Sequence, residues 1–278
     1  MGIAASQGLP HLLFLARKYR QQMSGGILQL GRQDAYFDFE VLQSQAQHFD
    51  VKLKSVSVRT VENPWSKRSV IDDQTLLSAL GFDTVESLDF VADEKPTFVH
   101  DLNEDVPASF HARWQVVFDG GTLEHVFDLA TALRNIHRML KPGGVVIHES
   151  PTNNFVDHGF WQINPTSLFD FYSTNGYEIL EAWICLFPSA DTMHYEAPHR
   201  FIYDPAAFEA LSVGRFPNGL ASVFIAARKP MQEKPAVKPT QGFYRRHWGV
   251  GEQSGRPPAV SALGGMLDLK SIAAGTMS

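Results

Sequence analysis

Three aspartates stand where predicted strands end, and this placement is the feature of the sequence that most directly suggests chemistry. The runs VESLD, TFVHD and QVVFD close on Asp89, Asp101 and Asp119. A carboxylate accepts hydrogen bonds from the hydroxyl and amino groups of a ligand. Lone aspartates at strand ends are also common turn formers. Because the ligand crevice of a parallel sheet lies at the carboxyl ends of its strands, we favour ligand contacts over turn formation.

Two histidines are candidates for moving a proton at the same place. His125 follows the strand that ends at Asp119, and His158 lies in the loop after the next predicted strand. Imidazole is the side chain best suited to act as a general base near neutral pH. The alternatives are a structural role for His125 and a hydrogen bond from His158 to a loop carbonyl. The sequence predicts that both border the crevice.

The elements that would position these residues alternate between strands and helices. Apolar runs and turn signals predict strands over 27–31, 85–89, 97–101, 115–119, 145–148, 177–185 and 221–227, and helical spacing predicts helices over 39–49, 76–80, 129–140 and 165–172. This alternation predicts parallel strands joined by helices, and so an α/β sheet that is covered on both faces. Asp128 and Asn164 are the expected N-caps of the last two helices.

The segment 118–151, FDGGTLEHVFDLATALRNIHRMLKPGGVVIHESP, combines two short motifs. LEHV follows a strand that ends in an acidic residue, and LKPGG precedes the next strand. In this combination the chain resembles the class I S-adenosylmethionine-dependent methyltransferases, in particular their small-molecule branch. The resemblance can be followed over about residues 27–229. It implies a Rossmann-like sheet of seven strands, mostly parallel with a final antiparallel strand, and helices on both faces.

The resemblance also implies contacts to the cofactor, S-adenosyl-L-methionine. Asp89 would accept hydrogen bonds from both ribose hydroxyls, and Asp101 would bind the adenine amino group together with the backbone of Leu102. Asp119 would hold the methionine ammonium group, and Gly120 would let the backbone approach the transferred methyl group.

The first strand departs from the family's pattern. An acidic residue followed by alternating glycines is expected there, whereas the sequence QLGRQDA keeps only Gly31. The cost is smaller than for a dinucleotide, because this cofactor has no pyrophosphate. Our hypothesis is that Arg32 pairs with the methionine carboxylate, and a solvated surface arginine is the alternative. No G-x-G-x-x-G follows a predicted strand, which disfavours a nicotinamide-dependent reductase.

The expected acceptor site lies beyond the fifth predicted strand. Trp161 is the candidate wall of the acceptor pocket, and His194 and Tyr195 would cover that pocket from the other side. With His158 or His125 as the base, the expected reaction is methyl transfer to oxygen or nitrogen of a small molecule, such as a sugar or a secondary metabolite. The alternative is a catalytically inactive, methyltransferase-like binding or assembly protein whose first-strand motif has decayed.

Composition limits the expected partners and location. The chain has 278 residues, a net charge of −6 and a single cysteine, Cys185. The acidic balance disfavours nucleic acid, and no apolar window is long enough to span a bilayer, so neither nucleic acid nor a membrane is expected. A homodimer is possible. One cysteine allows no internal disulfide, which favours a cytoplasmic location. No metal-ligand spacing predicts a metal site, although His148-Glu149 and Asp157-His158 leave one open.

Three regions are expected along the chain. Residues 1–26 are predicted to form an N-terminal helix packed on the domain, and residues 27–229 the methyltransferase-like domain, with an insertion at about 50–70. Residues 230–278 are rich in proline and lack a persistent helical or strand period, which predicts a linker and tail. The aromatic and basic cluster 243–248 within this tail could dock on the domain or on a partner.

Overall fold

One eight-stranded sheet forms the centre of the computed structural model, which describes residues 2–63, 67–191, 193–210 and 215–249. Along the sheet the strands lie in the order β11 (His199–Ile202), β10 (Glu178–Leu186), β12 (Ala221–Arg228), β9 (Leu140–Asn153), β8 (Trp114–Asp119), β2 (Gly25–Leu30), β6 (Phe82–Asp89) and β7 (Phe98–Val99). All seven predicted strands are present, with shifted ends.

The strand directions confirm a mostly parallel sheet. β2 pairs in parallel with β6 and β8, β8 pairs in parallel with β9, and β7 continues the parallel part beyond β6. β12 lies antiparallel between β9 and β10. The predicted count of seven strands is wrong by one, because β11 adds a second antiparallel strand beside β10. This edge strand has four residues, HRFI, which is too short for its alternation to be recognised in the sequence.

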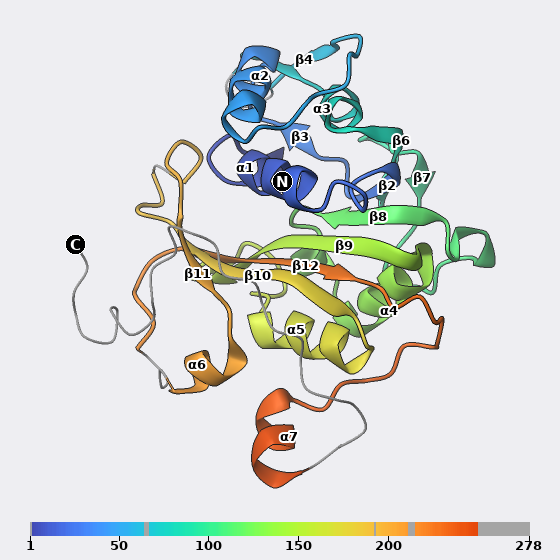
Figure 1. The fold of residues 1–278 in the computed structure, drawn as a ribbon, viewed down its shortest axis with the longest axis vertical. Coiled ribbons are helices and arrows are strands. Elements are labelled where there is room, and N and C mark those ends of the chain that lie inside the picture. The colour runs from blue at the N-terminus through green and yellow to red at the C-terminus, as the bar shows by residue number, and fades with distance from the viewer. Residues whose placement is uncertain (1, 64–66, 192, 211–214, 250–278) are drawn as a thin grey trace.

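Helices cover both faces of the sheet (Figure 1). On one face α1 (Gly8–Lys18), α2 (Phe39–His48) and α3 (Asp73–Leu80) pack in one apolar core. On the other face α4 (Leu129–Met139) and α5 (Pro165–Thr174) pack in a second core. Successive strand residues alternate between the cores, so that Ile27 and Val116 face the first and Leu28 and Val117 the second.

The helices begin where local signals place them. Asp128 accepts a hydrogen bond from the backbone N–H of Thr131, and Asn164 accepts one from Thr166, which confirms both predicted N-caps. Two 3₁₀ turns, η1 (Ala108–Phe110) and η2 (Leu123–His125), flank β8. The second turn carries the LEH of the LEHV motif.

The N-terminal segment lies beside the loop that follows β2. Strand β1 (Gly2–Ile3) pairs in parallel with β3 (Asp34–Ala35). The predicted insertion contains a hairpin of β4 (Thr60–Glu62) and β5 (Ser69–Ile71). It is fixed to α3, because the N–H of Arg59 donates to the hydroxyl of Thr75. The hairpin lies at the end of the molecule that α2 and α3 occupy (Figure 1).

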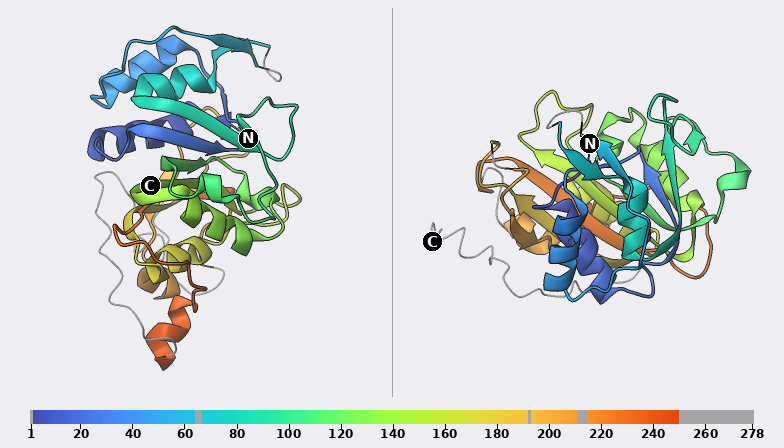
Figure 2. Two further views of the ribbon diagram at one scale, coloured as in Figure 1. Left: turned by 90° about the vertical axis from the view of Figure 1, so that its right-hand side faces the viewer. Right: turned by 90° about the horizontal axis from the view of Figure 1, so that it is seen from above.

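The proline-rich tail forms a helix that docks on the domain. α6 (Pro205–Ala210) precedes β12, and α7 (Gly242–Trp248) lies beyond α5 (Figure 2). The N–H of Gly242 donates to Asp170 of α5, and Arg245 pairs with the same carboxylate at 3.1 Å. The rest of the predicted tail, 250–278, falls outside the described residues. Among the helices that the structure describes, none has the length and apolar character needed to cross a bilayer.

Candidate functional site

The carboxyl ends of β2, β6 and β8 meet at one edge of the sheet. The N–H of Gly31 donates to the carbonyl of Leu88 at 2.8 Å, and the hydroxyl of Thr122 donates to the carbonyl of Leu30 at 2.6 Å. Asp89 therefore lies next to the loop after β2, and the loop after β8 lies on the other side. The sheet thus brings three of the four regions of predicted cofactor contacts together, and the fourth, at Asp101 and Leu102, follows β7.

Asp89 is the predicted cofactor residue whose carboxylate is least used within the protein. It accepts two long hydrogen bonds, from the N–H of Arg32 at 3.4 Å and from the N–H of Val91 at 3.3 Å. The residue is partly exposed at the carboxyl end of β6. An ionised carboxylate has about four lone-pair sites, so Asp89 keeps acceptor capacity for a ligand diol.

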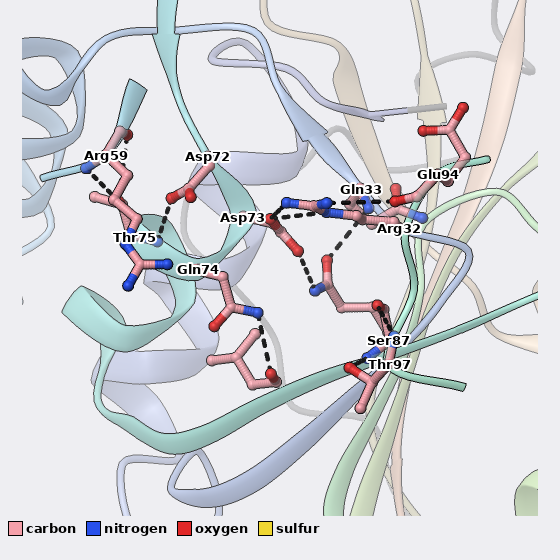
Figure 3. A network of polar contacts seen from close by, with 12 residues as sticks. Arg32, Gln33, Arg59, Asp72, Asp73, Gln74, Thr75, Ser87, Glu94 and Thr97 are labelled. Carbon is pink, nitrogen blue, oxygen red and sulfur yellow. Dashed lines mark hydrogen bonds and ion pairs between the residues drawn. The ribbon is translucent and has the colours of Figure 1, made fainter. Parts of the chain in front are cut away.

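The side chain of Arg32 is directed to a partner inside the protein (Figure 3). Its guanidinium pairs with the buried carboxylate of Asp73 at 3.1 Å and also donates to the carbonyl of Glu94 at 3.3 Å. The other oxygen of Asp73 accepts from Gln29 at 2.8 Å. The structure therefore gives Arg32 partners other than the solvent or the ligand considered from the sequence.

Gln33 is a residue that the sequence did not single out. Its amide nitrogen donates to the carbonyls of Leu30 and Gly31, while its buried Oε1 has no hydrogen-bond partner among the described residues. A Cβ placed on Gly120 would lie 2.4 Å from that oxygen, and one on Gly31 would lie 2.6 Å from the hydroxyl of Thr122. Gly31 also has φ of +66°. The left-handed backbone at Gly31 therefore favours glycine, whereas a Cβ on Gly120 would force the end of the Gln33 side chain to move.

Asp119 is fully buried, and its carboxylate is saturated by the protein. One oxygen accepts from the N–H groups of Thr122 and Leu123, and the other lies 2.7 Å from Nδ1 of His148. Nε2 of His148 lies 2.6 Å from the hydroxyl of Tyr172, and burial raises the pKa of that hydroxyl, so it donates to the imidazole. The carboxylate thus orders the loop after β8 rather than facing the crevice with a free oxygen.

Asp101 closes a turn. Its carboxylate accepts from the backbone N–H of Asn103 at 2.9 Å and from the side-chain amide of the same residue at 2.7 Å. Leu102 is buried, and its carbonyl accepts from Asn135 at 3.3 Å. These contacts are those of an aspartate that forms a turn, which was the alternative considered for Asp101.

The two candidate histidines meet around a third residue, Glu124. Their ring centroids are 5.3 Å apart, and Oε1 of Glu124 lies 4.0 Å from Nε2 of His125 and 3.8 Å from Nε2 of His158. The Glu124 side chain is 0% exposed, and neither of its oxygens has a hydrogen-bond partner among the described residues. Burial, and then the charge of Asp119, raises the pKa of Glu124 to about 9. Burial and the neighbouring His158 lower the pKa of His125.

The loop that carries His158 is fixed to the segment that carries His125. The N–H of Trp161 donates to the carbonyl of Glu124 at 3.1 Å, and its indole N–H donates to the carbonyl of Val126 at 3.0 Å. A Cβ on Gly159 would lie 2.7 Å from the carbonyl oxygen of Glu124. The two segments therefore approach as closely as a glycine allows.

Exposed aromatic side chains border this cluster. Phe127 and Phe160 are 66% and 65% exposed, and their rings make an edge contact at 5.4 Å. The ring of Trp161 lies 6.2 Å from that of Phe127. Two large aromatic rings facing solvent beside two histidines form a surface that can receive an apolar or aromatic ligand.

His194 and Tyr195 lie in a different neighbourhood. The ring of His194 contacts Tyr36 at 6.0 Å, and the carbonyl of the preceding Met193 accepts from the hydroxyl of Ser6. Tyr195 is 84% exposed. The contacts of this loop are thus with the N-terminal segment and the residues after β3, whereas the sequence placed both side chains over the pocket of Trp161.

The crevice fits S-adenosylmethionine at two points and departs from the expected contacts at others. Asp89 offers a carboxylate with spare acceptor capacity, and the unpartnered Oε1 of Gln33 lies beside Gly120, where the resemblance places the methionine end. Both oxygens of Asp119 and one oxygen of Asp101 are used by neighbouring groups of the protein.

A family model described as a methyltransferase domain matches residues 69–211, which is just over half of the chain. No curated protein matches the sequence. One similar solved structure is the 1,6-didemethyltoxoflavin-N1-methyltransferase of Burkholderia thailandensis, with bound 1,6-didemethyltoxoflavin and S-adenosylhomocysteine. Its sequence is 14% identical to this chain, the match covers 82% of this chain and 79% of its own, and the TM-score is 0.40. A SAM-dependent methyltransferase from Archaeoglobus fulgidus is 12% identical over 81% of this chain and 96% of its own, also with a TM-score of 0.40.

Proposed function

The chain belongs to the family of methyltransferase domains, the class I S-adenosylmethionine-dependent enzymes that its motifs resemble, and from this premise we propose that it methylates an oxygen or nitrogen of a small molecule. The observation that carries the proposal is the cluster of Glu124, His125 and His158, with its exposed aromatic border, on the loops that follow β8 and β9. These loops leave the same edge of the sheet as Asp89 and Gly31.

When bound, the cofactor supplies a methyl group on a sulfonium, which is already an activated leaving group. In the transfer, the acceptor's oxygen or nitrogen forms the new bond to the methyl carbon, the carbon–sulfur bond breaks with its electron pair going to sulfur, and S-adenosylhomocysteine remains. The protein must orient the acceptor and receive its proton. His158 and His125 are the proposed bases, and Trp161 with its aromatic neighbours is the proposed wall of the acceptor site.

The same geometry supports proton transfer at neutral pH. An imidazole with a lowered pKa is unprotonated near pH 7 and can accept a proton, and burial lowers the pKa of His125 in this way. Both rings are partly exposed, at 47% and 35% of the side chain, so an acceptor can reach them. The buried Glu124 side chain lies within 4.0 Å of both rings.

Two measurements test the proposal. Thermal denaturation with S-adenosylmethionine and with S-adenosylhomocysteine should show a rise in Tm, because a ligand at 100 times its Kd stabilises the folded state by about 2.7 kcal/mol. Release of S-adenosylhomocysteine is then measured with phenols, sugars and amines as acceptors. His158→Ala should keep the Tm shift and lose about 10²-fold or more in turnover, while the exposed His111→Ala control keeps both.

Two results would contradict the proposal or the assignment of His158 as the base. No Tm shift at millimolar concentrations of either ligand would favour the binding or assembly protein that the decayed first-strand motif suggests. Full turnover in His158→Ala would remove this histidine as the base and leave His125 to be tested in the same way.

A further inference from the structure

A buried carboxyl group with no hydrogen-bond partner among the described residues faces two imidazoles at the surface, and this arrangement is more than two candidate bases require. The side chains come from two segments that lie 33 positions apart, Glu124 and His125 on η2 and His158 in the loop after β9. Their nearest ligand atoms all lie within 4.8 Å of one another. A fully buried carboxyl group whose oxygens make no hydrogen bond to the described residues is costly, and it calls for a compensating group.

We propose that Glu124, His125 and His158 bind a divalent transition-metal ion. Two imidazole nitrogens and one carboxylate oxygen are a donor set that suits Zn²⁺ and its first-row neighbours better than Mg²⁺ or Ca²⁺, which prefer oxygen ligands. Three protein ligands leave coordination positions open toward solvent, as in catalytic zinc sites.

The distances are close to those of a bound ion. Ligand atoms about 2.1 Å from a tetrahedral metal lie about 3.4 Å from one another. The nitrogen of His125 is 4.0 Å and that of His158 3.8 Å from the Glu124 oxygen, and the three ligand atoms lie within 4.8 Å of one another. The pairs with Glu124 would therefore close by about half an ångström, and the two imidazole nitrogens by at most about 1.4 Å. Both rings are partly exposed and have room to make these shifts.

The surroundings hold the three ligands in place. The backbone and indole N–H groups of Trp161 bond to the carbonyls of Glu124 and Val126, which fixes the His158 loop against η2. Gly159 allows that approach, because a Cβ there would meet the Glu124 carbonyl at 2.7 Å. The charge of Asp119 behind Glu124 adds to the negative potential at the site. Such supporting contacts preorganise the ligands of a metal site.

Because the reaction itself rests on the proposed function, metal binding would change the part that the two histidines play in it. An imidazole that binds an ion does not take up a proton. The open coordination positions would instead hold the acceptor's hydroxyl or amine, lower its pKa and let its proton pass to solvent. Metal binding itself does not depend on methyl transfer, so the two can be tested apart.

The test is a titration of the full chain after dialysis against a chelator. Zn²⁺ is added in a calorimeter, and Co²⁺ is added while its visible absorption is recorded, since that absorption reports coordination without any activity. The wild type should bind one ion per chain. Glu124→Gln, which keeps the shape of the side chain, and His158→Ala should each weaken binding by about 100-fold or more, while His111→Ala should bind as the wild type does.

Several outcomes would overturn the proposal. These are no binding of Zn²⁺ or Co²⁺ by the wild type, equal binding by wild type and His158→Ala, which would mean an adventitious ion elsewhere, and displacement of Zn²⁺ by equimolar Mg²⁺. Because His158 lies in an exposed loop, its variant keeps the test decisive if Glu124→Gln fails to fold. A Tm shift with S-adenosylhomocysteine in the same samples reports the cofactor site separately, so either proposal can fail alone.

Discussion

Asp89→Ala tests the proposed contact between the carboxylate of Asp89 and the ribose of the cofactor. In the folded protein the carboxylate accepts only two long backbone hydrogen bonds, at 3.4 and 3.3 Å. Its removal should therefore cost the unliganded protein about 1 kcal/mol or less. The same carboxylate would accept two charge-assisted hydrogen bonds from the ribose diol, each worth about 1.5–3 kcal/mol. The variant should thus separate binding from folding.

The expected size of the effect follows from those bonds. Asp89 is partly exposed and water competes for it, so we take the lower bound of about 3 kcal/mol for the pair. At 1.4 kcal/mol for each factor of ten, this corresponds to an affinity for S-adenosylhomocysteine that is about 100-fold weaker. Calorimetric titration of wild type and variant measures the ratio directly.

The matched control is Asp83→Ala. Asp83 belongs to the same strand and carries the same charge, but it lies at the opposite end and is exposed, paired with Lys54 at 2.8 Å. An exposed pair of this kind contributes about 0–1 kcal/mol, and its loss should leave the affinity unchanged. If Asp89→Ala binds S-adenosylhomocysteine within about threefold of the wild type while its melting curve is intact, the ribose assignment is wrong. Equal losses in both variants would point to net charge instead.

Three further predictions concern the neighbouring loops and the acid stability of the fold. Arg32→Ala should lower Tm, because the buried Asp73 loses its cation. It should change the affinity for S-adenosylhomocysteine by less than about threefold in calorimetry, since the guanidinium is paired with Asp73. A tenfold loss of affinity would indicate that Arg32 binds the cofactor. Gly120→Ala should weaken S-adenosylhomocysteine binding at least tenfold in the same assay, because its Cβ, 2.4 Å from Oε1 of Gln33, would push the end of that side chain out of its place. Unchanged binding would show that the position of the Gln33 side chain does not matter for the cofactor. Burial lowers the pKa of His11 below 6.5, so the unfolded state binds more protons there and the free energy of unfolding should fall as pH drops through 6.5. Urea titrations from pH 7.5 to 5.5 should show a smaller fall for His11→Gln, and equal falls would contradict the assignment.

Local signals in the sequence were sufficient for the elements of the sheet. The runs that end at Asp89 and Asp119 are strands, and Asp128 and Asn164 cap the helices they were expected to cap. Each of these features depends on residues within a few positions of one another: the alternation of apolar side chains, a capping oxygen and the N–H it accepts from. The edge strand β11 was not predicted, because its four residues are too few to show that alternation.

The site was predicted less completely, because each functional side chain has several possible partners along the chain. The sequence placed Asp89, His125 and His158 near the crevice, and the sheet order brings them to its edge. It could not show that Asp119 would be saturated by His148, or that His194 would lie against Tyr36. Glu124 was overlooked as a functional residue because its spacing to His158 matches no common ligand motif, although LEHV contains it.

The sequence by itself determined the family, the order of strands and helices, and the presence of carboxylates and histidines where the strands end. Only the tertiary structure decided which of these groups bond to one another and which face the crevice. The physical reason lies in burial. An exposed carboxylate is satisfied by water whatever its neighbours, whereas Asp119, Glu124 and Asp73 are removed from water, and their chemistry is set by partners that folding brings from distant parts of the chain.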